Sequence, residues 1–226
     1  MLDYLVEVFL LVIVLVFFSA CSIRKKALDL WGVIIANLVG ITIFQLGGFS
    51  YFIIAVLFFV VAEASTRLSS SKKNGRHERR TIGNIFGNSG VAVIALAMGL
   101  PVGFFGAMAA ALADTLSSEI GMLSKRKPVL ITTFKEVEHG TDGGITPLGM
   151  WSSLFGGAII GLLHFLLNAN VYIFLVLIVA GTFGSLVDSF FGAVFERNKI
   201  LGNTEVNFLG SGAGAILALI LSILYL

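Results

Sequence analysis

The sequence predicts an all-α protein, a polytopic membrane helix bundle of about eight transmembrane helices that forms one integral membrane domain over residues 1–226. The composition is one reason: 57% of the residues are hydrophobic and 12% are charged, whereas an ordinary soluble domain has about 25% charged residues. Several apolar stretches also approach the ~20 residues that a helix needs to cross a bilayer. Membrane lipids are therefore expected partners, and nucleic acid is not.

The basic residues predict the topology. All 15 lysine and arginine residues fall into four clusters, and the apolar sequence between successive clusters is long enough for two crossings. The clusters are Arg24–Lys26, Arg67–Arg80, Lys125–Lys135 and Arg197 with Lys199. Because basic loops stay in the cytoplasm, both termini are expected outside, and a site formed by the polar loops would face the cytoplasm. In a prokaryote this membrane would be the cell membrane.

Each predicted helix is bounded by a turn or by a basic loop. The first stretch, YLVEVFLLVIVLVFFSAC, has Asp3 and Glu7 but no basic residue at its front, so we interpret it as a mature transmembrane helix and not as a signal peptide. The turns QLGGFSY, GLPVG and LNANVY divide the following helices into pairs, and two cytosolic loops, the basic 67–83 and the glycine-bearing 124–148, separate the pairs. The expected helices are 3–21, 28–46, 50–66, 84–99, 102–123, 149–167, 171–195 and 207–225.

Five polar side chains interrupt the predicted helices near their cytoplasmic ends. An ionisable group inside a membrane helix costs roughly 3 kcal/mol or more, so it usually faces a cavity and has a function. At ~1.5 Å per residue, each of the five lies within ~16 Å of the nearest basic residue, in the inner half of the bilayer. They are Glu63, Asn84, Asn88, Asp114 and Asp188.

Two aspartates make the best candidate metal ligands. Asp114 shares a helix face with Ser117 and Ser118, whereas Glu119 is expected to point about 140° away. Asp114 and Asp188 come from different helices and could converge on one divalent cation. The alternative is that these carboxylates are structural groups, hydrogen-bonded to serines in the bundle.

The loop RKPVLITTFKEVEHGTDGGITPLG follows Asp114 on the cytoplasmic side and is a candidate phosphate-binding segment. Lys135 and the successive backbone amides around Gly140, Gly143 and Gly144 could hold phosphate oxygens. The alternative is an ordinary basic loop attracted to anionic lipid head groups. Topology does not require the glycines, and we therefore favour a functional loop.

Further candidate phosphate contacts flank the fourth and the eighth helix. Arg79 and Arg80 could make bidentate contacts with phosphate. Asn84 and Asn88 are four residues apart and so share one helix face. Two more asparagines in the last polar loop are candidate ligand contacts, although helix capping explains them nearly as well. These are Asn203 and Asn207.

Intramembrane aspartates beside basic, glycine-bearing loops suggest an Mg²⁺–nucleotide site, in which carboxylates hold Mg²⁺ and basic residues neutralise phosphates. Catalysis would then consist mainly of positioning and charge neutralisation. Because the cavity would open within the membrane, the acceptor would be a lipid that carries a phosphate or alcohol head.

Five segments resemble the transmembrane protein 19 family, formerly described as a domain of unknown function, which includes plant and cyanobacterial phytyl phosphate kinases. They are ERRTIGNIFGNSG, ADTLSSEIG, HGTDGGITPLG, GTFGSLVDSFFGA and NTEVNFLGSGAGA. The resemblance extends from about Arg79 to the C-terminus.

A more distant resemblance is to the CTP-dependent phosphatidate cytidylyltransferases and dolichol kinases. Their pattern has an Asp, a Gly seven residues later, and then a Lys-x-x-Glu-Gly-x-x-Gly-Gly loop. The matching residues are Asp114, Gly121, Lys135, Glu138, Gly140, Gly143 and Gly144. The sequence departs from the pattern at His139, which lies between the glutamate and the first glycine.

The resemblance implies a CTP-dependent kinase that converts an isoprenoid monophosphate, such as phytyl or geranylgeranyl phosphate, to the diphosphate. Asp114 and Asp188 would bind the Mg²⁺ cofactor and act with Lys135 in catalysis. The other expected nucleotide and phosphate contacts are Arg79, Arg80, Asn84, Asn88, Ser118, Glu138, Gly140, Gly143, Gly144, Asn203 and Asn207.

Two other functions fit the same residues. A CTP-dependent lipid cytidylyltransferase would use the same metal and phosphate contacts. An ion-coupled transporter would use the intramembrane carboxylates, but transporters place such groups at the midplane between repeats, and this sequence shows no inverted repeat. The preferred nucleotide and the oligomeric state, a homodimer among the options, stay open.

Overall fold

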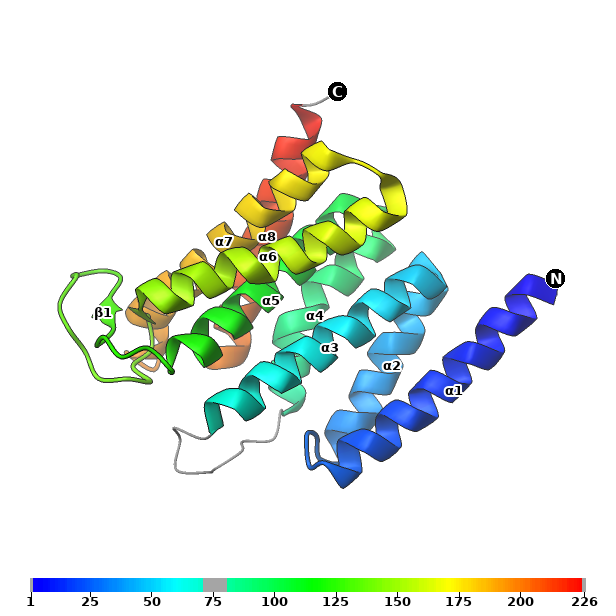
Figure 1. Ribbon diagram of the computed structural model, residues 1–226, viewed down its shortest axis with the longest axis horizontal. Helices are drawn as coiled ribbons and strands as arrows, with labels where there is room; N and C mark the ends of the chain where they lie inside the picture. The colour runs from blue at the N-terminus through cyan, green and yellow to red at the C-terminus, as the bar shows by residue number, and fades with distance from the viewer. Residues whose placement is uncertain (1, 71–80, 225–226) are drawn as a thin grey trace.

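The computed structural model describes residues 2–70 and 81–224. Within these residues the chain forms eight α-helices, a π-helical turn and a two-stranded hairpin, which confirms the predicted all-α class (Figure 1). The helices are α1 (Leu2–Arg24), α2 (Leu30–Gly47), α3 (Phe49–Ser70), α4 (Ile82–Ala97), α5 (Pro101–Gly121), α6 (Pro147–Asn168), α7 (Val171–Phe191) and α8 (Asn203–Ile223). The strands are β1 (Val129–Leu130) and β2 (Gly144–Ile145), and the π-helical turn η1 is Gly192–Glu196.

Six of these helices are long and apolar enough to cross a membrane: α1, α2, α3, α6, α8 and the continuous α7–η1 segment. The shorter α4 has 16 residues. In α5 most side chains are buried, among them the whole run from Gly103 to Ala113. This helix lies within the bundle and contacts α3, α4, α6, α7 and α8.

Small residues explain why α5 can occupy this central place. Glycine and alanine let membrane helices approach closely, since no large side chain separates their backbones. A Cβ atom added at Gly106 would lie 2.8 Å from the carbonyl oxygen of Gly214 in α8, and one at Gly156 in α6 would lie 2.7 Å from the Ala113 Cα. Close contacts of this kind fix the neighbours of α5 in register.

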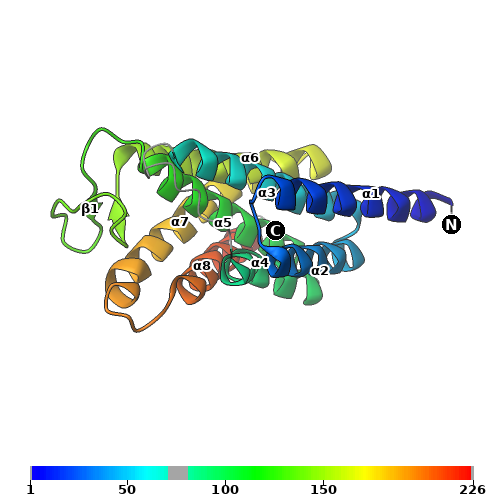
Figure 2. The same ribbon diagram turned by 90° about the horizontal axis from the view of Figure 1, so that it is seen from below.

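By contrast, α1 lies at the edge of the bundle beside α2, as both views show (Figures 1 and 2). Leu11 is the one buried apolar side chain among those described in α1, and it packs with Phe44 and Phe52 in a small cluster separate from the main core. Membrane lipids can cover the remaining apolar side chains of α1.

The hairpin in the glycine-bearing loop was not predicted. Val129 and Leu130 pair antiparallel with Ile145 and Gly144, and the hairpin lies at the end of the bundle away from both chain termini (Figure 1). Gly143, with a φ of +75°, lies against Ala193 of η1, where an added Cβ would be 2.4 Å from the Ala193 Cβ. The loop is therefore docked on the end of α7.

Candidate active site

A cavity of about 410 Å³ lies at this end of the bundle, enclosed by α3, α4, α5, the hairpin loop, α7, η1 and α8. Cavities of this size accommodate small-molecule ligands. Five acidic residues line it, and no lysine or arginine among the described residues does. The acidic residues are Asp114, Glu119, Asp142, Asp188 and Glu196.

Close packing of α5 against α7 brings the two predicted aspartates together. A Cβ added at Gly184 of α7 would lie 2.4 Å from the Ala110 Cβ of α5. One helical turn further along each helix are Asp188 and Asp114, whose carboxyl groups lie within hydrogen-bonding distance of each other. The Ser185 hydroxyl donates a long hydrogen bond, 3.5 Å, to Asp114 Oδ1.

This donor set fits a magnesium ion bound together with phosphate. Adjacent carboxylates repel each other when both are ionised, and a divalent cation removes that repulsion. The described residues contain no group of three or more His, Cys, Asp or Glu side chains arranged for a metal ion. Mg²⁺, however, is commonly held by one or two carboxylates together with substrate phosphates and water. Asp114 and Asp188 would be those two carboxylates.

The position of the Glu119 side chain differs from the predicted one. It was expected to point away from Asp114, yet both residues line the same cavity. The cavity is wide enough to reach around the end of α5 toward α3, where the Ser69 hydroxyl donates a hydrogen bond to Glu119 Oε2. Ser118 also lines the cavity, and its hydroxyl donates to the Thr115 carbonyl oxygen at 3.1 Å.

Three predicted glycines, Gly140, Gly143 and Gly144, line the cavity. The Gly144 N–H donates to the Thr141 carbonyl oxygen at 2.9 Å, and the Gly143 carbonyl accepts from the Ile131 N–H at 3.0 Å. The loop thus uses part of its backbone hydrogen-bonding capacity to hold its own shape. Gly143 in addition serves close docking on η1.

Asn84 and Asn88 lie on the face of α4 that borders the cavity. Asn84 Oδ1 accepts hydrogen bonds from the N–H and the hydroxyl of Thr81, each 2.9 Å long, and these bonds cap the start of α4. Asn88 is buried. Asn84 therefore has a structural role in addition to the predicted ligand contact.

Asn203 and Asn207 also line the cavity. They lie on α8, which begins at Asn203, four residues before its predicted start. Glu205 accounts for the early start, because its Oε2 accepts the Gly202 N–H at 2.9 Å and so caps the helix. A Cβ at Gly87 would lie 3.0 Å from the Asn207 Cβ, so α4 and α8 are in close contact where their asparagines converge.

Two predicted contacts lie outside the cavity. Lys135 is exposed and does not line it, and neither does Glu138. The Glu138 carboxylate instead pairs with Lys127 Nζ at 3.1 Å on the outside of the loop, where it raises the pKa of Lys127 above its ordinary value. Arg79 and Arg80 lie outside the described residues.

Glu63 does not line the cavity either, although it was among the five polar positions in the predicted helices. It is buried, and its Oε1 is 2.6 Å from Nη2 of Arg67, one turn further along α3. This arrangement agrees with the structural alternative for this residue.

Sequence reasoning did not single out Glu196 or Asp142. Glu196 ends the π-helical turn that extends α7, and such turns are frequent at functional sites. Asp142 lies in the motif HGTDGG between the predicted glycines, so its position in the sequence could have identified it as a site residue.

The fold and the site define an integral membrane protein with an acidic cavity at one end of its helix bundle. Residues 13–215 match the family described as Integral membrane protein DUF92, and the chain belongs to this family. The match confirms the resemblance to a family long described as a domain of unknown function.

Relatives occur in archaea and plants. An uncharacterized membrane protein of Methanocaldococcus jannaschii is 32% identical over 97% of this chain and 96% of its own. Protein PGR of Arabidopsis thaliana is 30% identical over 80% of this chain and 78% of its own, and protein VTE6, chloroplastic, of the same plant is 25% identical over 92% and 69%. No solved structure matches the chain.

Proposed function

We propose that this protein is a membrane-embedded, Mg²⁺-dependent kinase. It transfers a phosphoryl group from CTP, or from another nucleoside triphosphate, to an isoprenoid monophosphate such as phytyl or geranylgeranyl phosphate. The observation that supports this most directly is the contact between the Asp114 and Asp188 carboxyl groups in a cavity of ligand size. The nucleotide and the acceptor class come from the family resemblance.

The charge of the cavity is consistent with this chemistry. Five carboxylates would repel the phosphates of a nucleotide, so the nucleotide must arrive with its metal. Bound Mg²⁺ would neutralise charge on the phosphates and polarise the transferred group. Asp114 and Asp188 would hold it, while Asn84, Asn88, Asn203 and Asn207 offer uncharged amide groups to orient phosphate or nucleotide oxygens.

The proposed reaction transfers the terminal phosphoryl group. An oxygen of the lipid monophosphate attacks the γ-phosphorus, the bond from that phosphorus to the β,γ-bridging oxygen breaks, and the products are the nucleoside diphosphate and the lipid diphosphate. The attacking oxygen is ionised at neutral pH, so no general base is needed. Positioning and charge neutralisation account for the catalysis.

Radiolabel transfer in proteoliposomes tests the proposal. We expect label from γ-³²P-CTP in geranylgeranyl or phytyl diphosphate with wild-type protein, and loss of about 10²-fold or more in Asp114→Asn. Asp3→Asn, which changes an exposed aspartate on α1, is the matched control. Release of pyrophosphate in place of CDP would instead identify a cytidylyltransferase. Transfer by Asp114→Asn at the wild-type rate would contradict the metal-binding role.

A further inference from the structure

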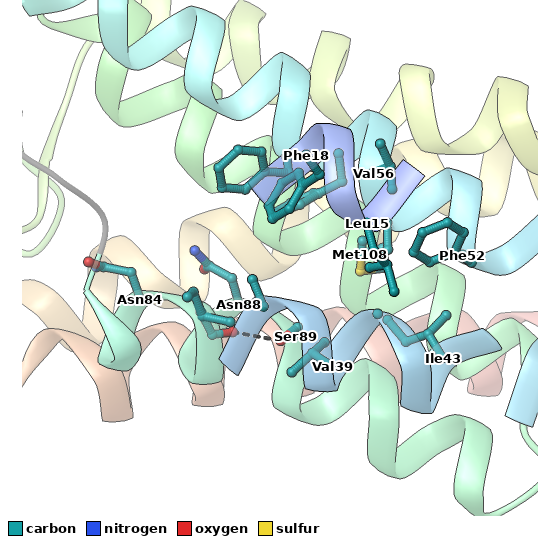
Figure 3. A pocket seen from close by; sticks show the side chains of 16 residues that line it. Leu15, Phe18, Val39, Ile43, Phe52, Val56, Asn84, Asn88, Ser89 and Met108 are labelled. Atoms are coloured by element: carbon teal, nitrogen blue, oxygen red, sulfur yellow. Dashed lines mark hydrogen bonds between the residues drawn. The ribbon is translucent and has the colours of Figure 1, made fainter. Parts of the chain in front are cut away.

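A second cavity, of about 80 Å³, lies among α1, α2, α3, α4 and α5 (Figure 3). Its walls are almost entirely apolar and include Leu15, Phe18, Val39, Phe52 and Met108. A buried water needs two to four polar partners, which the walls away from α4 do not offer. The cavity is suited to hydrocarbon rather than to an ion or to water.

The polar groups of this cavity gather on α4. Asn84, Asn88 and Ser89 line it at one end, while Phe52 and Ile43 lie at the other (Figure 3). The Ser89 hydroxyl donates to the Ile85 carbonyl oxygen at 2.6 Å, so it is satisfied within the helix. The two asparagines remain as the polar boundary of an otherwise apolar space.

Asn84 and Asn88 also line the acidic cavity, so the two cavities meet at the same side chains. A ligand that spans this boundary must be polar at one end and apolar at the other. A phosphate lipid whose head lies beside Asp114 and Asp188 has this form, and its first carbons would pass the two asparagines.

We propose that the apolar cavity binds the head-proximal part of the hydrocarbon chain of a phosphate lipid, with Asn84 and Asn88 at the junction between head and chain. This inference rests on the proposed function for the identity of the head group. The cavity, of about 80 Å³, is far smaller than a whole isoprenoid chain. It therefore takes only the first few carbons, and the rest of the chain continues into the bilayer.

The place of exit is the side covered by α1. Phe18 of α1 and Phe59 of α3 both line the cavity and meet edge to face, with their ring centroids 4.8 Å apart. Because Leu11, the one buried apolar side chain described in α1, packs in the small cluster apart from the main core, a chain can pass between α1 and α3 without disrupting the main core.

Photo-crosslinking tests the assignment without requiring turnover. The probe is geranylgeranyl monophosphate with a diazirine on the carbons next to the phosphate, in phosphatidylcholine proteoliposomes. Adducts are mapped by mass spectrometry. We expect them on cavity residues of α2, α3 and α5, and expect unlabelled geranylgeranyl monophosphate to compete better than the corresponding alcohol, which lacks the head group.

Two alanines of α3 provide a matched pair of variants. Ala55 lines the cavity, whereas Ala64 is exposed and lines neither cavity. Ala55→Phe fills the space and should reduce labelling about ten-fold, whereas Ala64→Phe should not change it. Ala36→Leu, a smaller change at the cavity wall in α2, should reduce labelling in a protein whose thermal unfolding is that of the wild type.

Equal labelling of Ala55→Phe and Ala64→Phe would overturn the inference, as would adducts confined to exposed side chains such as Phe17 and Trp31. The labelling experiment and the proposed kinase activity are tested independently. Normal labelling without phosphoryl transfer from any nucleotide would refute the kinase and retain the chain site. Transfer without cavity adducts would refute only the chain site.

Discussion

Gly184 of α7 packs so closely on Ala110 of α5 that a Cβ on the glycine would lie 2.4 Å from the alanine Cβ. Asp188 and Asp114 each lie four residues further along, and their carboxyl groups meet. The two helices run in the same direction, because Gly181 lies against Ala109 and Ser185 reaches Asp114. The small-residue contact therefore sets the geometry of the proposed metal site.

Gly184→Ala should separate the two aspartates. The added methyl group has no space, and overpacking of this kind costs about 1–3 kcal/mol. We expect a lower free energy of unfolding and weaker Mg²⁺ binding, measured by denaturant unfolding in detergent and by titration with Mn²⁺ under electron paramagnetic resonance.

Gly212→Ala is the control for this prediction. A Cβ at Gly212 has Val91 Cγ2 as its nearest neighbour, at 3.9 Å, so the same change fits there without displacement. It should leave Mn²⁺ binding as in the wild type and stabilise α8 slightly, by about 0.4–1 kcal/mol. Equal loss of Mn²⁺ affinity in both variants would show that the α5–α7 contact does not control the site.

Mg²⁺ and CTP together should raise the melting temperature, whereas monovalent salts at matched ionic strength should not. A ligand that binds only the folded protein at 100 times its dissociation constant stabilises it by ~2.7 kcal/mol. Asp114→Asn and Asp188→Asn should each abolish this gain, and Asp3→Asn should keep it. A gain that survives in both site variants would place the metal elsewhere.

The glycine-bearing loop can be tested at two of its glycines, both of which have positive φ angles. Gly143→Ala adds strain and also a clash, because its Cβ would lie 2.6 Å from the Ser189 carbonyl oxygen. Gly140→Ala adds strain of roughly 1–2 kcal/mol but meets nothing within 4 Å. Limited trypsin digestion after Lys135 should therefore be faster in Gly143→Ala than in Gly140→Ala. Equal rates would mean that the loop is not docked on η1.

Much of the fold could be predicted because it depends on local chemistry. The clustering of the basic residues and the apolar stretches between them predicted eight helices, and the cost of burying a charge in the membrane singled out Asp114 and Asp188. Both residues lie on long regular helices, so counting residues was enough to place them toward the same end of the bundle, where both line one cavity.

What could not be predicted depends on contacts between distant segments. The positions of Lys135 and Glu138 outside the cavity follow from the hairpin between β1 and β2 and from the docking of Gly143 on Ala193, fifty residues further along the chain. The angle between Asp114 and Glu119 was estimated for an ideal helix, which placed the two side chains apart. The cavity is wide enough for both residues to line it. The π-helical turn that places Glu196 does not alter the hydrophobic pattern of the sequence, so that pattern could not predict it.

Glu196 provides a last test, because it interacts electrostatically with both Asp114 and Asp188. If it contributes only negative potential, Glu196→Gln should weaken Mn²⁺ binding about three- to ten-fold and strengthen the binding of metal-free CTP, since the cavity becomes less repulsive to an anion. Calorimetry with and without metal measures both changes. Glu136→Gln, which alters an exposed carboxylate of the glycine-bearing loop outside the cavity, should change neither. A loss of Mn²⁺ affinity beyond about 100-fold, with no gain for metal-free CTP, would instead make Glu196 a direct metal ligand.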